Sequence, residues 1–168
     1  MIIENRTLKG YAILWDVESR PIHEDGRVFI ESIQKGAITL DPNPLTDIKL
    51  NFNHLDQNLP VARTGNNSLR LFYDEFGISY EADVPETSLG NDIILLVQNK
   101  TLNGESSIGM QVKKQKWLNT NRRIIEHGIL KEISIVTDAS YPQTRLDRKE
   151  LEQFQIDRKL LNTYKGKM

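Results

Sequence analysis

Three kinds of side chain that could carry out hydrolytic chemistry stand in separate apolar segments of this chain. His54 ends the alternating segment 48–54, Ser106 and Ser107 begin a second segment, and Glu132 lies inside a third. A general base, a hydroxyl nucleophile and an orienting carboxylate are the parts of a serine hydrolase. Whether they act together depends on the strands that position them.

His54 stands at the end of a predicted strand. Ile48, Leu50 and Phe52 alternate with polar residues, which predicts a half-buried strand. His54 shares their phase, so we expect its ring to point toward the interior at the end of the strand, beside a loop. A general base needs this placement, because it must be held rigidly and stay open to substrate on one side. The alternative is a half-buried structural histidine that a backbone group satisfies.

The two serines differ in strand phase. Ser106 is in phase with Ile108 and Met110, whereas Ser107 is in phase with Gly109. A glycine near a nucleophilic serine removes one Cβ from the path of a substrate carbonyl, although serines at strand starts are also common for structural reasons. Periodicity points Ser106 inward and does not select Ser107.

Glu132 alternates in phase with Leu130, Ser134 and Val136. A carboxylate on an apolar strand face is costly to bury unless it is paired or hydrogen-bonded. An imidazolium would compensate the charge and be oriented in return, which is the task of the third member of a catalytic triad. The alternative is a salt bridge to an arginine, for which the candidates are Arg63, Arg70, Arg122 and Arg123.

The rest of the hydropathy pattern predicts further short strands, at 8–16, 68–73, 78–84, 106–117 and 123–137. Thr87 or Ser88 can cap a helix over 89–100. Segment 27–37 is expected to end in a short helix or helical turn, and a charged helix is expected over 145–164. These elements predict an α+β, β-dominated fold, a closed or nearly closed β-barrel with a few flanking helices.

Composition excludes several classes of protein and site. The 168 residues fit one domain, and 22 Lys and Arg balance 23 Asp and Glu, so nucleic acid is not an expected partner. The chain has no cysteine, which excludes disulfides and thiolate chemistry. The longest apolar run, 93–97, is far shorter than a membrane span, and the first residues lack a signal-peptide layout. The histidines form no metal-binding motif, so no metal or cofactor is expected.

Taken in order, these segments resemble the prohead (procapsid) maturation proteases of tailed bacteriophages, a family related in fold to the herpesvirus assemblins. The resemblance covers roughly residues 8–144 and rests on the order and spacing of several short segments. These are 10–12 with 15–16, 29–31 leading to 36–38, 53–54 with 60–63, 76–78, 107–110, and 130–136 running into 139–142.

The resemblance assigns a role to each candidate residue. It implies that His54 is the general base, that Glu132 is the third triad member, and that Ser107 rather than Ser106 is the nucleophile, because the family's serine stands two residues before the glycine. The segment 137–140 replaces the paired arginines of the assemblins, so we expect backbone N–H groups of this loop to be the oxyanion donors.

The resemblance also implies an activity and partners. The expected protein is a serine endopeptidase that cleaves scaffold protein, or a scaffold-like segment of the major capsid protein, and itself, inside the assembling procapsid in the host cytoplasm. A dimer of this chain is considered as well. Residues 1–144 would be an assemblin-like catalytic domain, and 145–168 a charged helical segment that serves as a linker, packaging or self-processing segment. The alternative is a non-catalytic capsid-assembly or scaffold-binding β-barrel.

Overall fold

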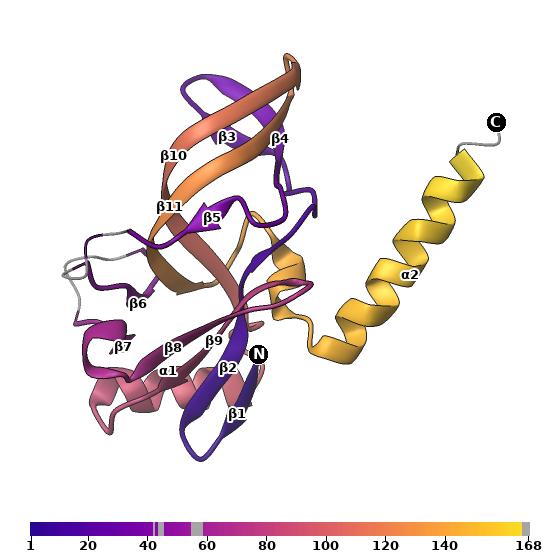
Figure 1. Cartoon of the computed structure of the whole chain (residues 1–168). Helices are drawn as coiled ribbons and strands as arrows, with labels where there is room; N and C mark the ends of the chain where they lie inside the picture. The colour runs from indigo at the N-terminus through magenta and orange to yellow at the C-terminus, as the bar shows by residue number, and fades with distance from the viewer. Residues whose placement is uncertain (42, 44–45, 55–58, 166–168) are drawn as a thin grey trace.

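The computed structural model describes residues 1–41, 43, 46–54 and 59–165, whose strands form two sheets (Figure 1). The smaller sheet is antiparallel, and its strands follow the order β1 (Ile2–Glu4), β2 (Thr7–Leu14), β9 (Gly77–Asp83) and β8 (Leu69–Tyr73). β8 and β9 form the hairpin that their sequence pattern predicts.

The larger sheet is mixed, and one long strand organises it. β11 (Arg122–Val136) pairs along one edge with its antiparallel hairpin partner β10 (Glu105–Asn119). Along its other edge it pairs in succession with three parallel strands, β4 (Arg27–Ile33), β5 (Ile38–Thr39) and β6 (Lys49–Phe52). The outer strands are β3 (Ile22–Glu24), beside β4, and β7 (Ala62–Arg63), beside β6. As a result, β6 and β10 flank the same stretch of β11 although they are far apart in sequence.

One hydrophobic core lies between the two sheets and helix α1 (Ser88–Gln98). The smaller sheet contributes Leu8 and Tyr80, the larger sheet contributes Leu50 and Ile133, and α1 contributes Ile93, all of which are essentially inaccessible to solvent. Burying a large apolar side chain stabilises the fold by about 1.5–3 kcal/mol. The core therefore fixes the inner faces of β6, β10 and β11, and their outer faces are left for other roles.

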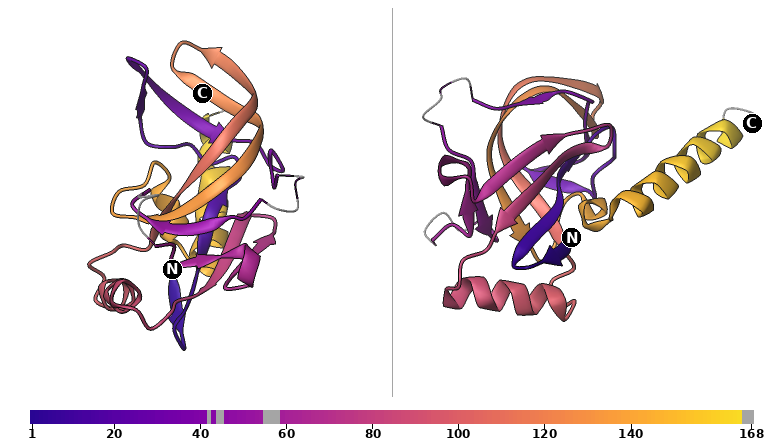
Figure 2. Two further views of the ribbon diagram at one scale, coloured as in Figure 1. Left: turned by 90° about the vertical axis from the view of Figure 1, so that its left-hand side faces the viewer. Right: turned by 60° about the horizontal axis from the view of Figure 1, so that its bottom comes forward.

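The C-terminal helix α2 (Arg148–Lys165) projects away from the sheets (Figures 1 and 2). It follows a short 3₁₀ turn, η2 (Pro142–Arg145). Leu151 is buried and Phe154 partly buried in a small cluster with Tyr11 and Phe76, which attaches the first turns of α2 to the body. The later apolar side chains of α2 are exposed. The helix expected over 145–164 is confirmed from Arg148 onward, and the division of the chain at residue 144 stays a prediction.

Two predictions about the fold need correction. A closed or nearly closed barrel is not confirmed, because no strand ladder joins the two sheets within the described residues. Alternation identifies strands and their buried faces, but pairing at sheet edges depends on contacts between distant segments. The short helix expected at the end of segment 27–37 is wrong, since β4 runs to Ile33 and a tight turn follows, with Gly36 at φ 75°.

Among the described residues, no helix is both long enough and apolar enough to span a membrane.

The structure also decides which residue caps α1. Thr87 accepts a hydrogen bond from the Gly90 N–H at 3.1 Å, whereas Ser88 is already the first helical residue. We expect Thr87→Ala to lower the free energy of unfolding by about 1 kcal/mol, because it leaves that amide without its partner. Ser88→Ala is the matched control and should change it by less than about 0.5 kcal/mol. Urea denaturation measures both, and equal losses in the two variants would contradict the assignment.

Candidate active site

Three neighbouring strands of the larger sheet present one polar face. In the register of β10, β11 and β6, Ser107 lies opposite Ser134, and Ser134 lies opposite Asn51. Glu132 precedes Ser134 by two residues and lies opposite Gly109. Opposite residues on neighbouring strands point to the same side of a sheet. Ser107, Glu132, Ser134 and Asn51 therefore share one face.

The other face of the same strands belongs to the hydrophobic core and carries Ser106. Leu50, Ile133 and Ile135 are fully buried on that face. Ser106 is 1% exposed, and its hydroxyl is 3.1 Å from the hydroxyl of Tyr80, whose pKa is raised by burial. The prediction that Ser106 points inward is confirmed. In that position its hydroxyl is not accessible to a substrate bound on the polar face.

Glu132 faces away from the core because β11 contains an extra residue. Met110 pairs with Leu130 and Gly109 pairs with Glu132, so Lys131 has no counterpart on β10. A β-bulge of this kind interrupts the alternation of side chains. Leu130 is consequently buried in the core, while the Glu132 side chain lies on the polar face and is 17% exposed. The expectation that Glu132 shares the apolar face of Leu130 is wrong, since alternation cannot reveal an extra residue.

His54 reaches the same polar face through a left-handed turn. β6 ends at Phe52, and Asn53 and His54 follow with φ angles of 51° and 55°. Asparagine and histidine are among the residues that enter this region most often. The turn takes His54 out of phase with Leu50 and leaves its side chain 44% exposed. The predicted interior direction of the ring is therefore wrong, and its place just beyond the end of the strand is confirmed.

The imidazole of His54 pairs with the carboxylate of Glu132. Nδ1 of the ring contacts Oε1, and the other oxygen, Oε2, accepts hydrogen bonds from Asn51 Nδ2 at 2.8 Å and from Ser134 Oγ at 2.9 Å. These partners compensate the partly buried charge. Within the described residues the four candidate arginines pair with other acids: Arg63 with Asp47, Arg70 with Asp83, Arg122 with Glu18, and Arg123 with Glu31.

Ser107 lies one strand away from the His54–Glu132 pair and is half-buried. It is the diagonal neighbour of Glu132 across the β10–β11 ladder, a relation in which residues are about 7–8 Å apart. The imidazole contacts Glu132 through Nδ1, which leaves Nε2 on the other side of the ring. Within the described part of the chain, Ser107 Oγ forms no hydrogen bond with His54. Catalytic hydrogen bonds of this kind are often long without substrate and tighten when it binds.

Gly109 makes room for the carboxylate of Glu132. A Cβ added at Gly109 would lie 2.7 Å from Glu132 Cγ and 3.1 Å from Oε1, both closer than normal contacts. The sequence favours a different role for this glycine, an open path to the serine. The structure shows that the vacated space is filled by the Glu132 side chain.

The loop 137–140, from which we expect oxyanion donors, is tied to the rest of the site. The amide of Thr137 donates to Asn53 Oδ1 at 3.2 Å, and the amide of Ala139 donates to Glu105 Oε2 at 2.8 Å. Those two N–H groups are thus engaged within the protein. The role of this loop as an oxyanion site stays a prediction.

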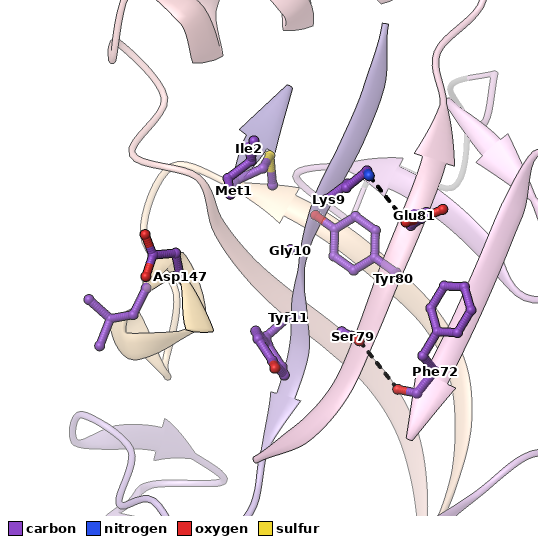
Figure 3. Close-up of a pocket in the computed structure, with 11 residues that line it drawn as sticks. Met1, Ile2, Lys9, Gly10, Tyr11, Phe72, Ser79, Tyr80, Glu81 and Asp147 are labelled. Atoms are coloured by element: carbon purple, nitrogen blue, oxygen red, sulfur yellow. Dashed lines mark hydrogen bonds and ion pairs between the residues drawn. The ribbon is translucent and has the colours of Figure 1, made fainter. Parts of the chain in front are cut away.

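A separate cavity of about 200 Å³ lies on the smaller sheet and includes Gly10, Tyr11, Phe72 and Tyr80 in its lining (Figure 3). None of the three candidate catalytic residues lines it. Across the described residues, no group of three His, Asp or Glu side chains is placed to hold a metal ion.

Asn51 and Ser134 belong to the site, although the sequence does not single them out. They are 3% and 0% exposed, and each stands between two apolar residues of a strand. A polar side chain in such a place needs a hydrogen-bond partner. Here the partner of both is Glu132.

Comparison with known proteins gives one match. A family model described as caudovirus prohead serine protease matches residues 2–157 of the 168. No curated protein and no solved structure matches the chain. The relation in fold to the herpesvirus assemblins therefore stays a prediction.

The close approach of Gly109 to Glu132 leads to a prediction. Gly109→Ala should lower the free energy of unfolding by about 1–3 kcal/mol through overpacking, and a crystal structure of the variant should show Glu132 displaced from His54. Gly128→Ala is the control on the same hairpin, because its Cβ would meet the end of the Ile38 side chain at 3.0 Å, far from Glu132. A Gly109→Ala variant with wild-type stability and an intact His54–Glu132 contact would contradict this account.

Proposed function

Because this chain belongs to the caudovirus prohead serine protease family, we propose that it is a serine endopeptidase whose catalytic triad consists of Ser107, His54 and Glu132. The observation that carries the proposal is the His54–Glu132 pair, which lies on the same sheet face as Ser107. The pair supplies the base and the orienting acid, and the neighbouring strand supplies the hydroxyl.

The contact with Glu132 favours one tautomer of the base. A carboxylate only accepts hydrogen bonds, so Nδ1 of His54 carries the proton that faces Oε1. Nε2 is then unprotonated and can take the proton of Ser107. A base prepared in this way needs no rearrangement of the acid before the first step.

The reaction proceeds by acyl transfer. Ser107 Oγ attacks the carbonyl carbon of a peptide while its proton passes to Nε2 of His54, and Glu132 stabilises the imidazolium that forms. His54 then gives the proton to the leaving amine as the C–N bond breaks, which leaves an ester on Ser107. Water, deprotonated by His54, attacks this ester and releases the acid product and the free serine.

Capsid proteins are the proposed substrates. The proposed enzyme cleaves the scaffold protein, or a scaffold-like segment of the major capsid protein, inside the procapsid in the host cytoplasm, and it also cleaves itself.

Residues 1–144 form the proposed catalytic domain. Residues 145–168 are a proposed linker, packaging or self-processing segment, in keeping with the exposed apolar side chains of α2. A dimer is a further proposal. The competing proposal is a non-catalytic capsid-assembly or scaffold-binding protein with the same fold.

The two serines provide a matched test of the nucleophile. We expect a serine-directed phosphonate to label the wild type and Ser106→Ala, and not Ser107→Ala, because of these two serines Ser107 is the one on the face of the base. Mass spectrometry of the labelled peptide identifies the site, and co-expression with the capsid proteins measures processing.

Three outcomes separate the alternatives. Loss of labelling and processing in Ser107→Ala alone supports the protease. Loss of labelling and processing in Ser106→Ala alone would identify Ser106 as the nucleophile and contradict the assignment to Ser107. A wild type that is not labelled, with capsid processing unchanged in Ser107→Ala, would favour the non-catalytic protein.

Glu132→Gln tests the role of the acid. Asn51 and Ser134 both donate to Oε2, which favours the new amide oxygen at that position and places the NH₂ group against Nδ1 of His54. The ring would then carry its proton on Nε2 and could not act as a base. We expect a folded protein whose turnover falls about 10⁴-fold, as for the equivalent change in other triads. Circular dichroism checks folding, and turnover at the wild-type rate would remove Glu132 from the mechanism.

A further inference from the structure

Ser134 joins the two halves of the His54–Glu132 pair through a single hydroxyl group. It is fully buried in β11, and its Oγ accepts a hydrogen bond from the backbone N–H of His54 at 3.1 Å. The same Oγ donates to Oε2 of Glu132 at 2.9 Å. An amide N–H can only donate, so the hydroxyl proton is free to point at the carboxylate. One atom thus links the backbone that carries the base to the side chain that orients it.

The backbone at His54 needs such an anchor. Asn53 and His54 are consecutive residues at positive φ, a conformation that is unfavourable for residues with a Cβ atom. The Asn53 N–H is held by the carbonyl of Ile135 at 2.9 Å, and the Asn53 side chain accepts the amide of Thr137 at 3.2 Å. At His54 itself, Ser134 Oγ is the group that holds the backbone N–H.

Ser134 also helps to decide which carboxylate oxygen meets the imidazole. Together with Asn51 it supplies two donors to Oε2, so Oε1 is the oxygen that is turned toward Nδ1 of His54. Without the hydroxyl, the carboxylate would lose one of these donors and the His54 turn would lose its side-chain anchor. Both losses widen the range of positions that the ring can take relative to Glu132.

We propose that Ser134 is a positioning residue of the active site, which fixes the tautomer and orientation of His54 without touching substrate. This inference rests on the proposed function, because it concerns the same base and acid. Ser134 is in register with Ser107, but its hydroxyl is buried and both of its hydrogen bonds are made to the site. Its effect therefore passes through His54 and Glu132.

The test compares Ser134→Ala with Ser19→Ala. Ser19 is also a buried serine whose hydroxyl accepts a backbone N–H, that of Glu31 at 2.8 Å, and it lies outside the site. Two readouts are needed: the rate of labelling by a serine-directed phosphonate, and the tautomer of His54 from ¹⁵N chemical shifts of its ring nitrogens. The chain has three histidines, so His54→Gln assigns the signals.

We expect Ser134→Ala to be labelled about 10- to 100-fold more slowly, the cost of a small misplacement of a catalytic group, and to show a mixture of the two ring tautomers. Ser19→Ala should lower the melting temperature by a similar amount and leave both readouts as in the wild type. Ser134→Thr, which keeps a hydroxyl, should retain the Nδ1-protonated tautomer.

Wild-type labelling or an unchanged tautomer in Ser134→Ala overturns the inference, as does a folded Ser134→Thr that behaves like the alanine variant. The proposed function fails separately, if the phosphonate does not label the wild type. The tautomer comparison requires no turnover, so it decides the role of Ser134 in either case.

Discussion

The site depends on the partial burial of one carboxylate. An ionised carboxyl group that leaves water without partners costs several kcal/mol, and the side chain of Glu132 is 17% exposed. The surrounding structure compensates that cost at each point of contact. Gly109 leaves the space that the side chain occupies, Asn51 and Ser134 donate to one oxygen, and His54 takes the other. The same contacts that satisfy the charge also orient the imidazole.

Structural and chemical roles are divided between the two faces of the same three strands. The inner face of β6, β10 and β11 is part of the core and keeps the strands in place. The outer face carries the polar residues, so their positions inherit the rigidity of the core and of the strand ladders. His54 is the exception, since it lies on a turn just beyond β6, where the backbone N–H groups of Asn53 and His54 donate hydrogen bonds to β11 in place of the ladder.

A second buried acid shows why the choice of partner matters. Glu31 is 3% exposed, pairs with Arg123 and accepts a hydrogen bond from Tyr141. Burial raises the pKa of Glu31 in spite of the neighbouring guanidinium. The Arg123 guanidinium lies 4.4 Å from the centre of the Phe29 ring, and its ion pair with Glu31 joins β11 to β4. Glu132 is paired instead with a histidine, the residue type that most often serves as a general base.

By itself, the sequence determined most of the main strands, the two main helices and the residue types of the site, because these follow from hydropathy period and side-chain chemistry. The order of short segments further determined the family. Only the tertiary structure decided how the strands pair and which face each site residue takes. Strand alternation predicted that both His54 and Glu132 point into the core. It could not reveal the left-handed turn at Asn53 or the extra residue Lys131. Such irregularities are set by hydrogen bonds between distant segments. Here they bring both residues to the face of Ser107.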